Sequence, residues 1–445
     1  MYILTAKLAL SILGCLAAWL AGTSARWRAL PPDRFLRVSW VLLAAARLGL
    51  FCAVFVVLRF AAHADVTVYY DEARSVLAGK TPVLDFFTPY SPPFPYLAAG
   101  PVLLWDSPKS IILLSIVLEL IAYPLWNIVG RRTFSEDVVR VASAIYIFGP
   151  LTAVNVTLSG QNHVWLSLFL AISLALLLSG RAVASGLTFG AGVALVKFLS
   201  LVHAPVLWVM ARHRCRWTAG FVLLPVAVCG AWYALGGDLV RNLAFHASDI
   251  SSGNLPFLLS AAGLDIASPA GNTAISALAL LVLGLVFLIP VLRHRGLSEA
   301  QALHMIAALA FVMLVVCKKT YPGYLIMSAF ACWLSLAARL GPRRGHLWAC
   351  VTVLSILGTC ESSLWFRLTD AVTFVGSRSA ATYARPEQLG FLIVVDVLLV
   401  ATYCVCTFVI WRPLAGGGSL DVADSQPDLT CLGGEARDGV RAGSL

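Results

Sequence analysis

Apolar runs about as long as a membrane-spanning helix follow one another along almost the whole chain. They cover residues 2–22, 38–60, 110–129, 141–157, 162–179, 184–197, 199–211, 217–235, 273–293, 299–317, 323–338, 346–365 and 387–411. A helix needs about 20 apolar residues to cross a hydrocarbon layer of about 30 Å. Because 60% of the 445 residues are hydrophobic and only 12% are charged, one soluble core could not bury these runs. The sequence therefore predicts an all-α, polytopic transmembrane bundle of about thirteen crossings.

The arginines between the runs predict a topology. If each run crosses once, these clusters fall on one side: Arg26, Arg28, Arg34 and Arg37; Arg131, Arg132 and Arg140; Arg181; Arg212, Arg214 and Arg216; Arg293 and Arg295; Arg339, Arg343 and Arg344; and Arg412. The positive-inside rule makes that side cytoplasmic. Residues 184–197 and 199–211 must then form a short hairpin, since each run reaches only about 20 Å. Segment 61–109 is placed on the extracytoplasmic side of a cell-membrane protein.

The two ends of the chain differ in character. Residues 2–25 are similar to a signal peptide, but they carry only Lys7 before the apolar core and four arginines follow, so we expect a retained first helix. We assign residues 1–412 to one transmembrane domain. The tail 413–445 has no apolar periodicity and is rich in Gly, Asp and Ser, which predicts a disordered cytoplasmic segment.

The charge and cysteine patterns argue against several kinds of partner. The net charge of +10 comes from short clusters between apolar runs, so we expect no nucleic-acid partner. The 11 cysteines fall mainly inside apolar runs and form no Cys-x-x-Cys pair or Cys/His cluster. The sequence also has no Asp-x-Asp motif, so we expect neither a metal nor a cofactor.

The first long loop collects acidic and aromatic residues. It reads DVTVYYDEARSVLAGKTPVLDFFTPYSPPFPYL over residues 65–97 and contains Asp65, Asp71, Glu72 and Asp85. The pattern predicts a short surface helix over 69–77 that Gly79 closes, then a proline-rich turn, and an interfacial apolar stretch over 94–105. Asp65 stands where the second run leaves the membrane, at the height at which a lipid delivers its head group. A general base for a reaction on such a lipid would be needed there.

Other interpretations of these carboxylates stay open at this point. Asp65 could be merely solvated, or it could cap a helix that begins near Val68. Asp71 and Glu72 are rivals for the role of base, and we expect them to face solvent or to position an acceptor.

Two stretches that make up about a fifth of the chain carry a family resemblance. In the first, Asp65, Tyr69, Ala73, Leu77, Ala78 and Gly79 precede a Tyr-Ser-Pro-Pro-Phe turn. In the second, residues 159–208, the match is carried by Gln161, Asn162 and Lys197. The chain thereby resembles the GT-C glycosyltransferases, and most of all the bacterial polyprenyl-phosphomannose-dependent alpha-1,2-mannosyltransferase-like family. Residues 317–327, CKKTYPGYLIM, depart from the Ser-Pro and His-His that the family often carries there.

The resemblance implies a GT-C architecture and a role for each matching residue. Asp65 would accept the proton of an acceptor hydroxyl while it attacks the anomeric carbon of a sugar and polyprenyl phosphate leaves. Tyr69, Gln161 and Asn162 would contact the substrate, and the chemistry would be independent of metal. Tyr70, which follows Tyr69, is a further candidate for substrate contact.

Three lysines offer positive charge for a phosphate. Lys318 and Lys319, with Tyr321 close by, break the charge rule because basic residues are otherwise sparse on that side. They could neutralise a departing lipid phosphate, or they could snorkel to the head groups. Lys197, beside the bend of the short hairpin, could serve the same phosphate or cap helix carbonyls.

A third outer segment, residues 241–260, could close over a lipid head group. Arg241 and His246 are its candidates for contact with the phosphate or with a sugar hydroxyl. The Ser-Ser-Gly-Asn stretch 251–254 predicts a turn.

Charged residues inside the helices need partners. Arg47 and Glu119 lie at similar depth in the second and third runs, so we expect a structural ion pair between them. Asp396 in the last run has no partner that the sequence identifies.

The sequence favours an inverting glycosyltransferase that moves a sugar, with mannose first by resemblance, from a polyprenyl-phosphate donor to a lipid or polysaccharide acceptor. The alternative is a membrane transporter or lipid flippase, which should concentrate polar residues at the bilayer midplane and which often shows internal repeats. The sequence has no convincing repeat, and it has neither a nucleophile with metal-ligand spacing nor an HxxxxD pair that would indicate another transferase.

Overall fold

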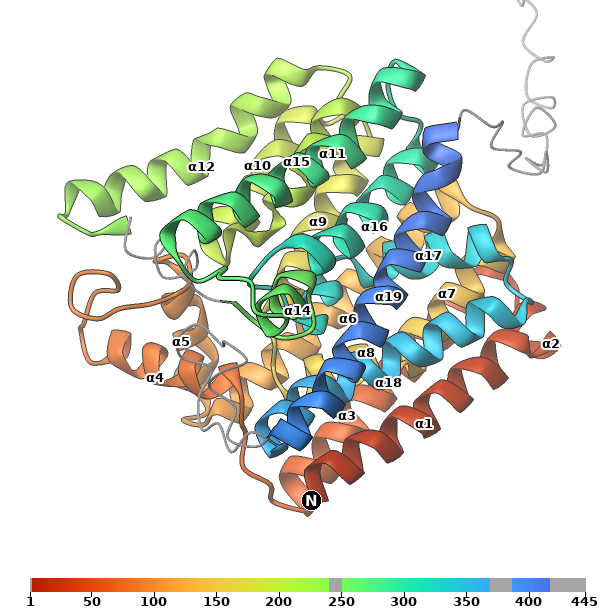
Figure 1. Cartoon of the computed structure of the whole chain (residues 1–445), viewed down its shortest axis with the longest axis horizontal. Coiled ribbons are helices and arrows are strands. Elements are labelled where there is room, and N and C mark those ends of the chain that lie inside the picture. The colour runs from red at the N-terminus through yellow and green to blue at the C-terminus, as the bar shows by residue number, and fades with distance from the viewer. Residues whose placement is uncertain (1, 240–249, 369–385, 417–445) are drawn as a thin grey trace, which may run out of the picture.

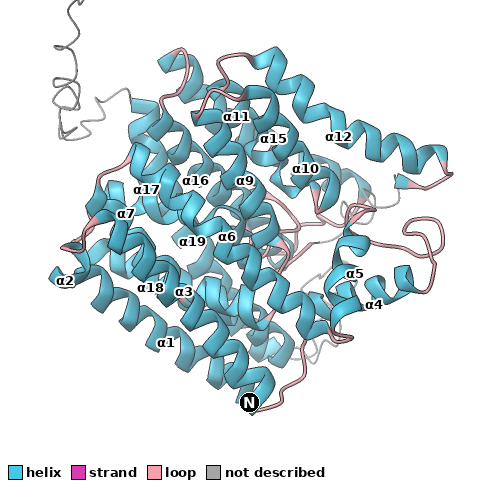
Figure 2. Ribbon diagram, turned by 180° about the vertical axis from the view of Figure 1, so that it is seen from behind, coloured by secondary structure: helices cyan, strands magenta, loops and turns pink. Residues whose placement is uncertain are grey.

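The computed structural model describes residues 2–239, 250–368 and 386–416, and within these ranges the chain forms helices and loops without a β-strand (Figure 1). Nine of the described helices are long and apolar enough to cross a membrane, and a pair bent by 43° raises the number to ten. The protein is therefore a multi-pass membrane protein. Seen from behind, most of the described residues lie in helices, and a wide loop stands beside α4 and α5 (Figure 2).

The long helices pack side by side in one bundle (Figure 1). They are α1 (Tyr2–Thr23), α3 (Pro32–Phe51) with η1 (Cys52–Val57), α6 (Pro108–Thr133), α12 (Arg214–Ala234), α15 (Pro269–His294), α16 (Glu299–Val316), η4 (Pro322–Ser328) with α17 (Ala329–Leu340), α18 (Gly345–Leu368) and α19 (Pro386–Gly416). The bent pair is α7 (Glu136–Phe148) with α8 (Pro150–Thr152) and η2 (Ala153–Leu158). The shorter elements are α2 (Ala25–Arg28), α4 (Asp65–Leu77), α5 (Phe94–Leu104), α9 (His163–Leu178), α10 (Ala182–Leu195), η3 (Phe198–His203), α11 (Ala204–Met210) and α14 (Leu255–Ala261).

The predicted all-α bundle is confirmed, whereas the count of about thirteen crossings stays a prediction. The difference lies in α9, α10 and η3 with α11, which are shorter than a full span. The chain does break between α10 and η3, where the short hairpin was predicted. The last helix continues to Gly416, past the predicted boundary at 412, and residues 417–445 lie outside the described residues.

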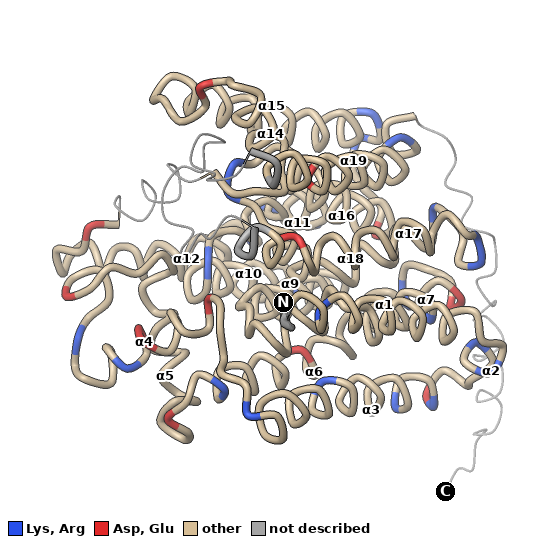
Figure 3. Tube along the Cα trace, turned by 60° about the horizontal axis from the view of Figure 1, so that its bottom comes forward, with Lys and Arg blue, Asp and Glu red and all other residues tan. Residues whose placement is uncertain are grey.

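The two ends of the bundle differ in charge. Arginines gather where α2, the start of α7 and the ends of α15, α17 and α19 lie (Figure 3). Contacts tie this end together: Arg28 pairs with Asp137, Arg132 pairs with Glu299, and His294 bonds the carbonyl of Leu414. The helices α4 and α5 stand at the opposite end (Figure 1). The arginine clusters predicted to lie on the cytoplasmic side are thus gathered at one end of the molecule (Figure 3).

Glycines let α10 approach α12 closely. A Cβ on Gly186 would lie 2.1 Å from the carbonyl oxygen of Trp217, and one on Gly220 would lie 2.3 Å from that of Val183. Membrane helices without a hydrophobic force between them associate through such small-residue contacts. The contact fixes α10, and hence the residues that follow it, against the bundle.

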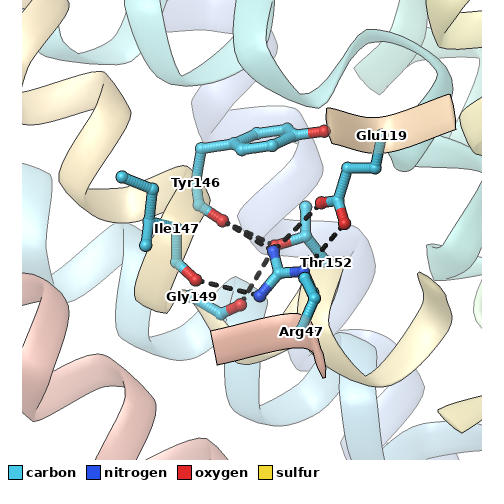
Figure 4. A network of polar contacts seen from close by, with 6 residues as sticks. All are labelled: Arg47, Glu119, Tyr146, Ile147, Gly149 and Thr152. Atoms are coloured by element: carbon cyan, nitrogen blue, oxygen red, sulfur yellow. Dashed lines mark hydrogen bonds and ion pairs between the residues drawn. The ribbon is translucent and has the colours of Figure 1, made fainter. Parts of the chain in front are cut away.

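A buried arginine organises the break between α7 and α8 (Figure 4). Arg47 in α3 forms a bidentate pair with Glu119 in α6, with Nε–Oε2 at 2.8 Å and Nη2–Oε1 at 3.0 Å. The predicted ion pair between these helices is thereby confirmed. The guanidinium also donates to the carbonyls of Tyr146 and Ile147 at 3.1 and 3.0 Å.

Pro150 explains why those carbonyls need a donor. In a continuous helix the carbonyl of Tyr146 would accept from residue 150, but proline has no N–H. The Thr152 hydroxyl and the Arg47 guanidinium replace that donor, at 2.8 and 3.1 Å. Because lipid offers no water for an unsatisfied carbonyl, this arginine makes a kinked helix tolerable inside the bundle.

We expect Arg47→Met to destabilise the protein by about 3–5 kcal/mol, because it leaves Glu119 buried without its cation. The change can be measured as a lower Tm in detergent. Exchanging the charges in Arg47→Glu with Glu119→Arg restores the ion pair but not the donors to Tyr146 and Ile147. The double variant should therefore still melt well below the wild type.

The matched control is Arg132→Met, which breaks the half-exposed Arg132–Glu299 pair at the basic end. It should cost less than about 1 kcal/mol. Wild-type stability in the charge-exchanged variant would mean that the carbonyl contacts of Arg47 contribute nothing.

Candidate functional site

Asp65 is the first residue of α4 and is half-buried. The preceding residue, Ala64, has a positive φ of 66°, and no side chain caps the helix. The interpretation of Asp65 as a helix cap is therefore wrong, and the helix begins three residues earlier than Val68. The Asp65 carboxylate forms no hydrogen bond or ion pair with another residue of the described ranges. Its oxygens remain available to accept a proton.

Lys197 occupies the break between α10 and η3 and is 7% exposed. Its ammonium lies 3.4 Å from the Tyr324 hydroxyl and 4.9 and 5.6 Å from the ring centroids of Tyr324 and Tyr90. Among the described residues the Lys197 ammonium donates to no helix carbonyl, so its predicted alternative role as a cap gains no support. Burial lowers the pKa of the Lys197 ammonium to about 8. The negative charge of the Asp65 carboxylate acts in the opposite direction and raises this pKa. Asp65 and Lys197 thus lie within electrostatic reach of one another.

Aromatic rings form a wall beside these two charges. Tyr69, Tyr90 and Phe94 pack with ring centroids 5.0 Å apart, and Phe94 continues the wall to Trp165 at 5.4 Å. Ser91 attaches the turn to the end of α10 through the carbonyl oxygens of Val193 and Val196. The proline-rich turn is therefore fastened where it places Tyr90 over Lys197.

The two stretches that carry the family resemblance meet in space. Gly160, with a φ of 58°, has no room for a Cβ, which would lie 3.0 Å from Val66 in α4. Gln161 and Asn162 follow and lead into α9, and Asn162 is fully buried. The start of α4 therefore packs directly on the turn before α9.

Lys318 and Lys319 lie in the loop between α16 and η4, together with Tyr321. Lys318 is 8% exposed, and burial lowers its pKa. The charge of Lys319 reaches Lys197, and Tyr321 packs on Tyr324 with centroids 5.6 Å apart. This loop therefore borders the same site.

The turn predicted at 251–254 is confirmed and fastens this loop. Asn254 caps α14, and its side chain donates to the carbonyl of Lys318 at 3.0 Å. Ser251 bonds the backbone of Thr320, and Gly253 has a φ of 78°. The predicted contacts Arg241 and His246 lie outside the described residues.

Glu72 does not face solvent, which was the first of the two alternatives predicted for it; a role in positioning an acceptor stays a prediction. It is 6% exposed and accepts a hydrogen bond of 3.0 Å from Thr88, which also accepts one from the backbone N–H of Tyr90. Burial raises its pKa to about 8. Glu72 therefore links α4 to the turn that carries Tyr90, whereas Asp71 is exposed.

The structure brings most of the predicted site residues to one place. Asp65, Tyr69, Asn162 and Lys197 lie together, with Gln161, Lys319 and Tyr321 at the border. Tyr70 points elsewhere, since its hydroxyl bonds Asp106 at 2.7 Å and lies beside Arg74.

Three residues of the site were missed by sequence reasoning: Tyr90, His163 and Tyr324. Each had a signal in the sequence. Tyr90 opens the proline-rich turn, and His163 follows the Gln-Asn pair. Tyr324 stands three residues after Tyr321, a spacing that a 3₁₀ turn brings onto one face.

We expect the pH dependence of stability to report the buried carboxyl of Glu72. Its pKa is about 8 in the folded protein against an ordinary 4.5, so the folded state holds the proton more tightly. Stability is therefore greatest below the ordinary pKa and falls as pH rises toward about 8, by at most about 1.4 kcal/mol per pH unit. Tm measured from about pH 5 to about pH 9 should be flatter in Glu72→Gln than in the wild type.

Asp33→Asn is the control, because Asp33 is an exposed carboxylate on α3. Its profile should follow the wild type. An equal slope in Glu72→Gln and the wild type would contradict a raised pKa at Glu72.

Comparison with known proteins assigns no family to the chain. No protein-family model matches the sequence, and no curated protein or solved structure is significantly similar to it. Within the described ranges, no three His, Cys, Asp or Glu side chains are grouped so that they could hold a metal ion. What the site offers is an available carboxylate, a buried ammonium and an aromatic wall.

Proposed function

We propose that the protein is an inverting GT-C-like glycosyltransferase that moves a sugar from a polyprenyl-phosphate donor to a lipid or polysaccharide acceptor outside the cytoplasm. One observation carries the proposal. The Asp65 carboxylate, which pairs with no described residue, stands within electrostatic reach of the buried Lys197 ammonium. A glycosyl transfer needs this combination, since a proton must be accepted on one side of the sugar and a negative charge stabilised on the other.

The step divides between these two groups. The acceptor oxygen forms a bond to the anomeric carbon from the face opposite the phosphate, and Asp65 takes the proton of that hydroxyl. The bond between the anomeric carbon and the phosphate oxygen breaks, and the leaving phosphate keeps the electron pair. Lys197 meets this growing charge, with Lys319 close enough to assist.

The surroundings of the site suit a lipid-linked donor. The end of α5 exposes large apolar side chains next to the loop, with Leu103 71% and Leu104 91% exposed. Apolar residues of this kind bury themselves at the boundary between head groups and acyl chains. A prenyl chain held there would lie beside α4, the helix that Asp65 begins.

The sugar follows only from the family resemblance, which favours mannose. A screen of radiolabelled polyprenyl-phosphate mannose, glucose, arabinose and galacturonate with the purified protein in liposomes identifies the donor.

A transporter or lipid flippase is the second candidate, and buried charges favour it. Lys7, Glu361 and Asp396 lie in α1, α18 and α19 and are each at most 8% exposed. Ionisable residues inside a membrane often mark a transport pathway. Movement of a labelled lipid across liposomes without a new glycosidic product would support this candidate over transfer.

We expect Asp65→Asn to lower the rate of transfer by at least about 100-fold, because asparagine cannot accept the hydroxyl proton. Asp71→Asn, an exposed carboxylate on the same helix, should keep wild-type activity. Both variants should elute as folded protein with an unchanged Tm. Full activity in a folded Asp65→Asn variant would sink the assignment.

The rate should also depend on the charge of Lys197. With a pKa of about 8, the ammonium loses its charge as pH rises above that value, so kcat/KM should fall on the alkaline side. Lys197→Arg should remove this fall because a guanidinium stays charged, and Lys197→Gln should be slow at every pH. Glu72→Gln serves as a control, since Glu72 titrates in the same range. An alkaline fall that persists in Lys197→Arg would assign it to another group.

A further inference from the structure

Polar atoms without partners are concentrated at the start of α9. Asn162 is fully buried and His163 is 2% exposed. Neither end of the Asn162 amide and neither ring nitrogen of His163 has a hydrogen-bond partner in the part of the chain that the structure describes. Each such buried group destabilises the ligand-free protein when nothing satisfies it.

The backbone adds donors at the same place. Asn162 occupies the position before the first turn of α9, and its side chain caps no N–H. The N–H groups of His163 and Val164 donate to no described residue. The first turn of a helix combines free N–H groups with the positive end of the helix dipole, which suits an anion.

The charged and aromatic residues of the candidate site lie close to the start of α9. The centroid of the Tyr324 ring lies 4.5 Å from that of His163 and 4.9 Å from the Lys197 ammonium. The charge of Lys197 reaches His163, and the hydroxyl of Tyr69 lies against the backbone of Asn162. A buried cation therefore stands beside an unsatisfied helix start.

We propose that the start of α9, with Asn162, His163 and Lys197, is the subsite for the phosphate of a lipid-linked phosphosugar. The inference rests on the proposed function and names where its donor is held. The phosphate oxygens accept hydrogen bonds from the helix N–H groups, from the Asn162 Nδ2 and from the ring N–H of His163. The Asn162 Oδ1 needs a donor instead, which a sugar hydroxyl next to the phosphate supplies.

The proposal predicts an unusual relation between stability and binding. If the Asn162 amide is unsatisfied until a ligand arrives, Asn162→Leu removes a cost from the ligand-free protein. The variant should melt no lower than the wild type while losing affinity for the phosphate. A structural asparagine would behave in the opposite way, since its replacement would lower Tm.

The test measures binding without turnover, on the full-length protein in detergent. Undecaprenyl phosphate should raise the Tm of the wild type, and undecaprenol should not. In Asn162→Leu and His163→Ala the Kd should weaken by at least about tenfold, as expected for a lost hydrogen bond to a charged group. Phosphatidic acid and inorganic phosphate in separate arms determine whether the site requires a prenyl chain, an acyl chain or the phosphate alone.

His304→Ala is the matched control. His304 is also buried, at 3% exposed, but it packs on Phe134 at the basic end of the bundle. It should keep the wild-type Kd. Wild-type affinity in His163→Ala, or an equal Tm rise with undecaprenol, would overturn the subsite.

These experiments distinguish a failure of the phosphate subsite from a failure of the proposed glycosyl transfer. Asp65→Asn should abolish transfer but still bind undecaprenyl phosphate at a pH well below the pKa of Lys197, because the proposed phosphate contacts come from the start of α9 and from Lys197. Phosphate-dependent binding without transfer from any donor would reject the glycosyltransferase and retain the subsite.

Discussion

Every polar backbone group inside the bilayer needs a partner from the protein itself, and the bundle depends on how it meets this constraint. Where a helix is continuous, the hydrogen bonds between its own N–H and C=O groups satisfy them. Where Pro150 separates α7 from α8, Arg47 supplies donors to the freed carbonyls, and Glu119 supplies the charge that stabilises the buried Arg47. The kinked segment can then carry the chain toward Gly160 and the start of α9. The candidate site stands on an irregularity that the Arg47 contacts stabilise.

Helix ends and breaks supply the groups of the site. Asp65 begins α4, Asn162 precedes α9, Lys197 separates α10 from η3, and Tyr321 precedes η4. Inside a helix the backbone N–H and C=O groups bond to one another, whereas the N–H groups of the first turn have no partner within the helix. Such positions offer hydrogen-bonding capacity that the backbone of a helix interior does not. This is a physical reason for the broken helices to meet at one end of the bundle.

Much of the fold could be predicted from the sequence because hydrophobic length is a strong signal. The Arg47–Glu119 pair followed from equal depth in two runs, and the break near Lys197 followed from the shortness of the runs around it. The burial of Glu72 could not be predicted, because it depends on Thr88 folding back over α4. The roles of Tyr90 and Tyr324 depend on contacts with Lys197 that join distant segments. The pattern of apolar residues within one run cannot predict contacts between segments that are far apart in the sequence.

The buried Arg47–Glu119 pair also constrains the order of events during biosynthesis. An arginine at the centre of a lone helix costs about 2.5–3.5 kcal/mol to insert, and α3 carries that cost until α6 provides the glutamate. The segment between these two helices contains Asp65, Glu72 and Tyr90. It is therefore synthesised, and must leave the membrane, before the pair can close. Membrane insertion of α3 is thus completed only when α6 follows, and the loop with the proposed base is delivered between the two events.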